Sequence, residues 1–355
     1  ESQRFRQITM KVLTMQLNST SVMDIIAYGG AAVGMIVTLS QFMEGKVSVH
    51  GALMLILLSS EFFIPLRLLG SFFHIAMNGM AVSDRIFALL DLPEPEEKEL
   101  LLDGKNMDIT FSGVRFSYEK SREILKGVDM VFPAGSFTSI VGASGCGKST
   151  AAAILMGRNR GYEGSVTIGG RELSQVWEAS LMEQITLVNH NSYLFKGTVE
   201  SNLRMGKAAA TQEEMKKALK MVNLWGFLDA QQGLLTPILE KGSNLSGGQC
   251  QRLAIARALL ADTPVYIFDE ATSNIDAESE AMIMDVIHTL AETRTVLLIS
   301  HRLANVVGSD RIYMMKDGRI AETGSHEMLL AQDGAYAKLY RAQMELEEYG
   351  REVCA

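Results

Sequence analysis

Residues 142–149 read GASGCGKS, three glycines followed by a lysine and a serine. The stretch fits the pattern G-x-x-x-x-G-K-[ST], with Gly142, Gly147, Lys148 and Ser149 at the fixed positions. The apolar run SFTSIV precedes it and STAAAILMG follows it, which indicates a strand, a tight turn and a helix. This order predicts a phosphate-binding loop at the end of a buried strand.

The residue types of this loop suit phosphate chemistry. Glycines let backbone N–H groups converge on phosphate oxygens without a Cβ clash, and a helix N-terminus adds positive potential. Lys148 can reach the terminal phosphates, and the Ser149 hydroxyl can ligate Mg²⁺. The residues of the loop expected to bind the nucleotide are Gly142, Ser144, Gly145, Cys146, Gly147, Lys148, Ser149 and Thr150.

A second stretch, PVYIFDE at residues 264–270, predicts the acidic half of the site. Asp269 ends an apolar run typical of a central strand, so its carboxylate can hold Mg²⁺. Glu270 follows at once and can polarise an attacking water. The alternative is that both acids are solvated turn residues.

From about Met107 onward, strand-like and helix-like stretches alternate. MDITFSGVRFSY alternates as a strand does, and TVLLIS is a short apolar run. This pattern predicts an α/β sheet with helices packed on it.

The N-terminal part is different in character. Residues 25–43 hold nineteen residues without a charge, and a second apolar stretch begins near Val49. A helix of that length spans a bilayer core of roughly 30 Å. We therefore expect spans at about 22–43 and 49–72. Lys and Arg concentrate outside the hairpin tip, so we expect the helix extensions to be cytoplasmic. The alternative is a buried helix of a large soluble protein.

Four segments follow from these patterns. They are a partial transmembrane domain at 1–91, a linker at 92–106 around the charged PEPEEKE, a nucleotide-binding domain at 107–345, and a C-terminal tail at 346–355. The chain begins with Glu1 rather than Met, and we expect further spans before it.

Composition excludes some classes of partner. The 355 residues carry a formal net charge of −8, and no basic patch or tail favours nucleic acid. The three cysteines lack the spacing of a metal site or a disulfide framework, which favours a reducing compartment.

The order of Tyr118, GASGCGKST, LSGGQ at 245–249, IFDE at 267–270 and His301 resembles the nucleotide-binding domain of an ATP-binding cassette (ABC) transporter. The resemblance covers nearly all of residues 107–345. It implies an α/β P-loop ATPase cassette with a helical signature subdomain, here preceded by an all-α transmembrane hairpin. The whole is similar to the C-terminal part of an exporter-type half-transporter, with ATP and Mg²⁺ as cofactors.

The resemblance also implies site roles. Two cassettes pair head to tail in this family, so that LSGGQ of one subunit caps the ATP of the other. Tyr118 resembles the aromatic residue that stacks on adenine, and His301 resembles the histidine that contacts the γ-phosphate. Asp276 matches a loop that touches the partner cassette. The signature residues assigned to ATP are Ser246, Gly247, Gly248 and Gln249.

One departure from the family pattern concerns the expected metal contact, and a milder one is SNID in place of the usual Ser-Ala-Leu-Asp. LVNHNSYLF, at residues 187–195, is similar to the segment in which a glutamine reaches Mg²⁺ and the attacking water. His190 stands at that position, so we expect it to serve as a metal-contacting and catalytic residue. The alternatives are that Asn189 or Asn191 reaches the site, or that the partner's site does the hydrolysis.

These features predict an ATP-driven exporter subunit in the cytoplasmic membrane, multi-pass, with its ATP-binding domain in the cytoplasm. Its expected partners are a second half-transporter, identical or related, the lipid membrane and an unidentified solute. EFFIPLRLLGSFFH, at 61–74, resembles the last span of bacterial thiol exporters that support cytochrome bd assembly. The alternative function is a regulatory membrane ATPase, or the low-activity partner of a heterodimeric transporter.

Overall fold

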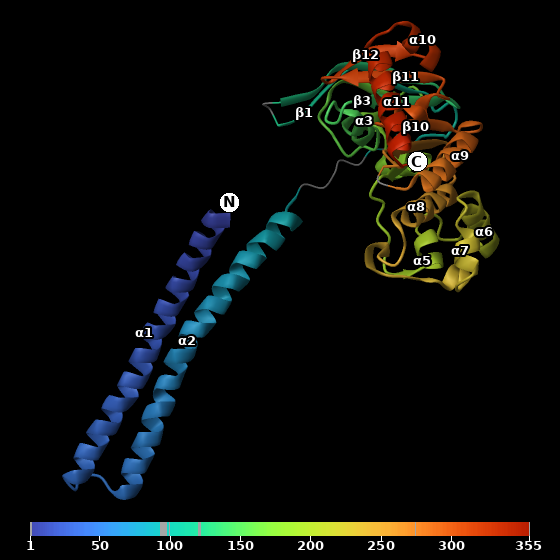
Figure 1. Ribbon diagram of the computed structural model, residues 1–355. Helices are drawn as coiled ribbons and strands as arrows, with labels where there is room; N and C mark the ends of the chain where they lie inside the picture. Colours follow the sequence, from blue (N-terminus) through green and yellow to red (C-terminus); the bar gives the residue numbers. More distant parts are fainter. Residues whose placement is uncertain (1, 93–97, 99, 120–121, 274, 355) are drawn as a thin grey trace. The chain divides into compact units, whose positions relative to one another are not determined.

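The protein divides into two compact units, residues 1–96 and residues 97–355. The computed structural model describes residues 2–92, 98, 100–119, 122–273 and 275–354. Most of the predicted linker motif PEPEEKE, residues 93–97 and 99, lies outside the described residues. Figure 1 shows the helices and strands of both units.

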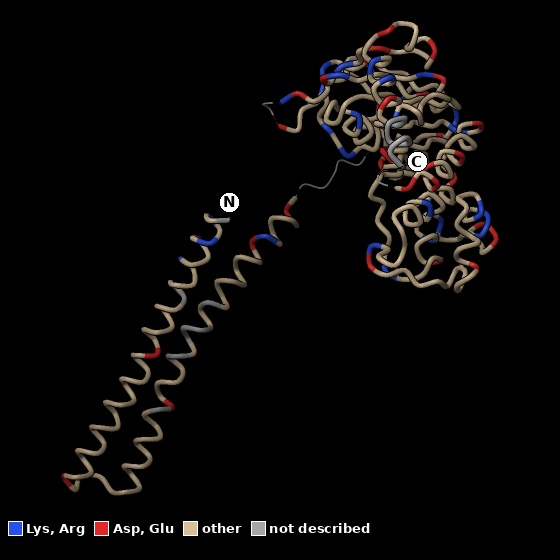
Figure 2. Tube along the Cα trace, viewed as in Figure 1, with Lys and Arg blue, Asp and Glu red and all other residues tan. Residues whose placement is uncertain are grey.

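The first unit is a hairpin of two long helices, α1 (Ser2–Met43) and α2 (Val49–Leu90). Small residues allow their close approach. A Cβ atom on Gly30 would lie 2.4 Å from the ring of Phe63, and one on Gly34 would lie 2.9 Å from Cβ of Ser59. Charged residues are sparse along both helices (Figure 2). Small residues at such a contact are typical of helix pairs in lipid.

Length and composition identify one helix that can cross a membrane among the described residues, and it runs from Gln3 to Met43. The apolar part of α2, from Val49 to Pro65, is shorter. A bilayer core takes about 20 consecutive apolar residues. The second expected span, residues 49–72, therefore stays a prediction.

The second unit contains a six-stranded sheet in the order β12-β11-β3-β10-β9-β6. All neighbouring pairs are parallel except β11 with β12. The carboxyl ends of β3, β9 and β10 therefore meet at one edge of the sheet. The strands are β3 (Phe137–Gly142), β6 (Ile185–Asn189), β9 (Val265–Asp269), β10 (Thr295–Ile299), β11 (Arg311–Lys316) and β12 (Arg319–Gly324).

Alternation along the central strands sends side chains into two separate cores. Ile267 and Leu297 face the core shared with α3 (Lys148–Leu155) and a four-stranded antiparallel sheet. Phe268 and Leu298 face the core shared with the helices on the other side. The antiparallel sheet has the order β2-β1-β4-β5, formed by β1 (Ile109–Glu119), β2 (Arg122–Phe132), β4 (Glu163–Ile168) and β5 (Arg171–Glu172).

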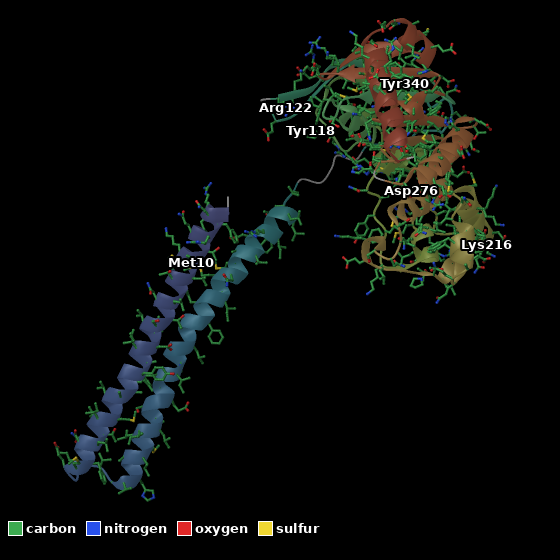
Figure 3. The ribbon with its side chains drawn as sticks, in the orientation of Figure 1. Met10, Tyr118, Arg122, Lys216, Asp276 and Tyr340 are labelled. Atoms are coloured by element: carbon green, nitrogen blue, oxygen red, sulfur yellow. The ribbon has the colours of Figure 1, made fainter. Side chains whose placement is uncertain are left out.

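Helices between β6 and β9 form a helical subdomain. Thr211 and Glu214 make a capping box at the start of α6. Lys216 of α6, labelled in Figure 3, has its Nζ 5.7 Å from the centroid of the Trp225 ring. The subdomain consists of β7 (Gly197–Thr198), α5 (Val199–Leu203), α6 (Gln212–Met221), α7 (Trp225–Asp229), β8 (Pro237–Ile238) and α8 (Gly247–Ala261).

The remaining helices are α4 (Glu178–Gln184), α9 (Ala277–Ala291), α10 (His326–Ala331) and α11 (Ala335–Cys354). Because α11 continues to Cys354, most of the segment 346–355 predicted as a tail belongs to this helix. The predicted fold class, an α/β cassette with a helical subdomain after a helical hairpin, is confirmed.

Replacing Leu253 by alanine should lower the free energy of unfolding by about 2–5 kcal/mol, because it leaves a cavity in the core. Leu253 lies in α8 and is 0% exposed. Leu239, which is 50% exposed, supplies the matched control, and Leu239→Ala should cost less than about 1 kcal/mol. Chemical denaturation of both variants measures the difference, and equal losses would contradict the burial of Leu253 in the core.

Candidate functional site

The phosphate-binding loop joins β3 to α3, and its backbone requires glycine at two positions. Gly142 has φ +146° and Gly147 has φ +108°, both in the left-handed range. A Cβ atom on Gly142 would lie 2.2 Å from the carbonyl oxygen of Met315, and one on Gly147 would lie 2.7 Å from Cδ2 of Leu125. No larger residue fits here unless the neighbouring backbone or core moves.

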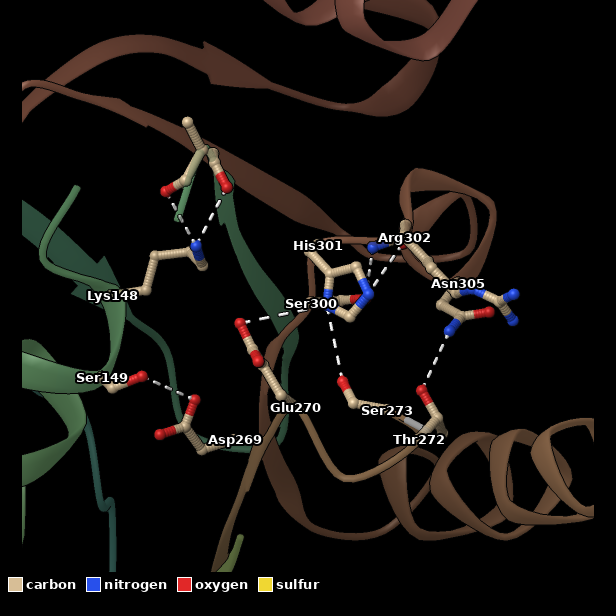
Figure 4. Close-up of polar contacts among 12 residues, drawn as sticks. Lys148, Ser149, Asp269, Glu270, Thr272, Ser273, Ser300, His301, Arg302 and Asn305 are labelled. Carbon is tan, nitrogen blue, oxygen red and sulfur yellow. Dashed lines mark hydrogen bonds and ion pairs between the residues drawn. The ribbon is translucent and has the colours of Figure 1, made fainter. Parts of the chain in front are cut away.

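Lys148 is the first residue of α3, and its side chain curls back over the loop. It is 4% exposed, and its Nζ donates to the carbonyl oxygens of Gly142, at 2.9 Å, and Ala143, at 3.1 Å (Figure 4). The N-cap residue Gly147 supplies no side-chain acceptor, so the first N–H groups of α3 have no side-chain cap. The loop thus offers a buried cation and uncapped amide donors, which fits a phosphate.

The remaining predicted residues of the loop divide by exposure. Ser144, Gly145 and Ser149 are exposed, whereas Cys146 and Thr150 are buried. The hydroxyl of Tyr118, on β1, lies 3.4 Å from Oγ1 of Thr150. The Tyr118 ring is 62% exposed, which leaves it open to stacking beside the loop.

Asp269 ends β9 directly opposite the loop. Its Oδ1 accepts a hydrogen bond of 3.1 Å from Oγ of Ser149, and the residue is 9% exposed. Burial is the main reason that the pKa of Asp269 is raised, and the charge of Glu270 adds to it, although the Ser149 hydrogen bond acts in the opposite direction. A buried carboxylate of this kind is stabilised by a cation.

Oδ1 of Asp269 and Oγ of Ser149 are suitable ligands for Mg²⁺. Carboxylate and hydroxyl oxygens are hard ligands, and Mg²⁺ commonly takes one or two from protein and the rest from phosphate and water. Across the described ranges, no group of three or more His, Cys, Asp and Glu residues has the geometry of a metal site. The pair Ser149 and Asp269 therefore fits a metal held jointly with a nucleotide, not one held by protein alone.

Glu270 and His301 meet at the same edge of the sheet. Parallel pairing sets Asp269 opposite Ile299, and the N–H of Glu270 donates to the carbonyl of Ile299 at 2.9 Å. Oε1 of Glu270 lies 3.9 Å from Nδ1 of His301, and Oγ of Ser273 lies 3.4 Å from the same nitrogen (Figure 4). Glu270 has φ +52°, a conformation that non-glycine residues adopt at a cost and often at functional sites.

A supporting network around His301 was missed by the sequence reasoning. Glu280 of α9, 7% exposed, forms an ion pair with Arg302 and accepts a hydrogen bond of 2.8 Å from Nδ2 of Asn305. The same amide nitrogen donates to Oγ1 of Thr272 at 3.2 Å. A signal was present, because Glu280 shares a helical face with the buried Ile283, three residues on.

His190 follows the end of β6, next to β9, where Asn189 pairs with Asp269. Its Nε2 lies 2.9 Å from Nδ2 of Asn191. Nε2 of Gln251, in α8, donates to the carbonyl of Asn189 at 2.9 Å, so α8 contacts the last residue of β6, directly before His190. His190 and Gln251 line one pocket of about 360 Å³.

The signature residues start α8. Ser246 and Gln249 form a capping box. The N–H of Gln249 donates to Oγ of Ser246 at 3.2 Å, and the N–H of Ser246 donates to Oε1 of Gln249 at 2.9 Å. A Cβ atom on Gly248 would lie 2.2 Å from Oγ of Ser279, so Gly248 permits contact with α9. Ser246 and Gly247 are exposed.

Asp276 is the N-cap of α9 and accepts from the N–H of Ser279 at 2.8 Å, which lowers its pKa. Among the residues that the structure describes, no hydrogen bond or ion pair joins residues 246–249 to residues 142–150. The predicted site residues therefore fall into two groups, one at the sheet edge and one at the start of α8 and α9.

Comparison with known proteins agrees with this geometry. The profile of the ABC transporter family matches residues 125–273. An "uncharacterized ABC transporter ATP-binding protein" of Haemophilus influenzae is 47% identical over 99% of this chain and 63% of its own. An ATP-dependent lipid A-core flippase of Vibrio parahaemolyticus is 37% identical over 96% of this chain and 60% of its own.

Among solved structures, a bacterial Atm1-family ABC exporter with ATP bound has a TM-score of 0.70 and 31% identity. The match covers 96% of this chain and 60% of that one. The chain thus spans about six tenths of the length of these proteins. The matched part of the chain is an ABC transporter ATP-binding domain.

Replacing Asp269 by asparagine should raise the thermal unfolding midpoint in metal-free buffer at neutral pH. The isosteric amide keeps the acceptor for Ser149 but removes a buried charge. The same change should abolish stabilisation by Mg²⁺ with nucleotide. Asp285→Asn, at an exposed position of α9, is the control. A lower midpoint for Asp269→Asn would show that the buried charge does not destabilise the metal-free protein.

Proposed function

We propose that this chain is the ATP-hydrolysing subunit of an ABC-type membrane exporter. The observation that carries the proposal is the meeting of Lys148, Ser149, Asp269, Glu270 and His301 at one edge of the sheet. These residues come from three separate strand ends. Their functional groups are those required to bind a triphosphate, hold a divalent cation and orient water.

Each residue has a distinct role in the proposed hydrolysis. Lys148 exchanges its two carbonyl partners for phosphate oxygens, so that its charge remains compensated while buried. Ser149 and Asp269 would hold Mg²⁺, which would offset phosphate charge. Glu270 accepts a hydrogen bond from the attacking water and orients it, and His301 contacts the terminal phosphate.

The second group of residues supports a paired arrangement. The start of α8 is exposed at Ser246 and Gly247, and a helix N-terminus attracts phosphate. We propose that this end caps the ATP held by a second half-transporter, in a head-to-tail pair. Gly248, Gln249 and Asp276 then support the cap indirectly, through the capping box and the packing against α9.

His190 is proposed to contact Mg²⁺ and the water in place of a glutamine. Its support is position, since it follows β6, the strand paired with β9, and lies near enough to Asp269 to oppose part of the rise in that residue's pKa. A neutral imidazole nitrogen is a suitable ligand for a divalent metal, although oxygen suits Mg²⁺ better.

The hairpin supports a place in the membrane, with both α1 and the start of α2 in lipid and the ATP-binding unit in the cytoplasm. The domain limits 1–91, 92–106 and 107–345 belong to this proposal. The named relatives include lipid A-core flippases, and residues 61–74 resemble thiol exporters. Transport of labelled lipid or thiol into vesicles distinguishes these solutes from each other and from a non-transporting regulatory ATPase.

Glu270→Gln should retain ATP binding and lose most of the turnover, by roughly two orders of magnitude or more. Lys148→Ala should lose binding itself, because no buried cation then meets the phosphates. The measurements are phosphate release and nucleotide affinity of the purified protein. Glu278→Gln, at an exposed site in the first turn of α9, is the matched control. Normal hydrolysis by Glu270→Gln would remove Glu270 from the mechanism.

Lys148→Ala chains and Ser246→Arg chains should each be inactive alone. Mixing the two variants should restore ATPase activity. Each mixed pair contains one composite site with an intact loop from one subunit and an intact signature from the other. Differently tagged subunits allow mixed pairs to be isolated and assayed. Isolated mixed pairs as inactive as either parent would argue against head-to-tail pairing.

A further inference from the structure

Gln343, on α11, contacts the backbone on both sides of Arg302. Its Nε2 donates to the carbonyl oxygen of His301 at 2.6 Å, and its Oε1 accepts from the N–H of Leu303 at 2.8 Å. One side chain thus bonds both peptide groups that bracket the residue after His301. The side chain of Leu303 is 0% exposed, so the chain enters the core immediately after this contact.

The chemistry of the contact requires an amide. A backbone carbonyl only accepts and a backbone N–H only donates, so the two partners fix the orientation of the Gln343 side chain. A glutamate has the same shape but no donor, and its carboxylate would repel the carbonyl oxygen of His301. A leucine would leave both peptide groups without these bonds, at the cost of an unmade hydrogen bond for each.

α11 is itself anchored to the six-stranded sheet. The carboxylate of Glu322, on β12, accepts from the N–H of Ala335 at 2.5 Å and of Tyr336 at 3.1 Å. It therefore caps the start of the helix with a negative charge. Tyr336 is 0% exposed, and its hydroxyl lies 2.8 Å from Nδ1 of His326. Gln343 follows Ala335 by two turns, about 12 Å along a fixed axis.

The ring of His301 is held less firmly than its backbone. Its Nδ1 is 3.9 Å from Glu270 and 3.4 Å from Ser273, both longer than a strong hydrogen bond. Arg302 contacts Glu280 on α9, which holds one side of this segment. The position of the imidazole therefore depends on the peptide backbone that Gln343 fixes from the side of α11.

We propose that Gln343 is a positioning residue that sets the place of His301 for ATP hydrolysis. The inference rests on the proposed function, because it assigns His301 a contact with the terminal phosphate. Gln343 acts through the backbone of residues 301–303 and links the end of α11 to the catalytic edge of the sheet. A change in α11 that moved Gln343 would change turnover without touching the nucleotide.

The test compares Gln343→Leu, Gln343→Glu and the exposed control Gln332→Leu in the full-length protein, with and without His301→Ala. Both Gln343 variants should lower kcat on the order of tenfold, with KM for ATP changed less than about twofold. In the His301→Ala background, the same Gln343 changes should lower kcat by less than about a further twofold. An unchanged kcat, or an equal loss in both backgrounds, overturns the proposal.

Hydrogen exchange provides a readout that is independent of activity. The amide of Leu303 should exchange faster in both Gln343 variants than in wild type or Gln332→Leu, with the thermal midpoint confirming a folded protein. Unchanged exchange at Leu303 would overturn the contact. Wild-type hydrolysis that does not depend on Glu270 would overturn the proposed function, whereas exchange at Leu303 would still decide whether Gln343 holds this segment.

Discussion

The parallel pairing of β10 with β9 on one side and with β3 on the other is the contact on which the candidate site depends. It sets Ile299 opposite both Asp269 and Ile140, so that β9 and β10 end at the same level and β3 ends two residues further on, at Gly142. A shift of register by one residue would send the alternating side chains of β9 and β10 into the wrong core. The phosphate-binding loop, the two acids and His301 are therefore tied to the packing of both cores.

The site holds charges that burial alone disfavours. Lys148 is covered and held by two carbonyl oxygens, and the pKa of Asp269 is raised chiefly by its burial. In the proposed function, a nucleotide and its metal would supply opposite charge to each of these groups. Such buried charges cost stability, as is common at functional sites.

The residues that support His301 come from both directions along the chain. Glu280 approaches from α9, which starts soon after Asp269 and Glu270, and Gln343 approaches from the C-terminal helix. Both act on the backbone or on neighbours of His301, not on its ring. The segment after β10 is thus linked to α9, which packs beside α8. It is also linked to α11, which Glu322 joins to the edge strand β12.

Local sequence patterns were enough to predict the phosphate-binding loop, the acidic strand end and the α/β class. In each of these, strand, turn and helix signals lie within ten or so consecutive residues, and glycine, lysine and carboxylate carry the chemistry directly. The same local reasoning did not find Glu280 or Gln343. Arg302, the partner of Glu280, lies 22 residues from it along the chain, and His301, the partner of Gln343, lies 42 residues from it. Only the packing of α9 and α11 against the sheet decided those contacts, because a side chain's hydrogen-bond partner depends on which backbone groups the folded chain brings within about 3 Å of it.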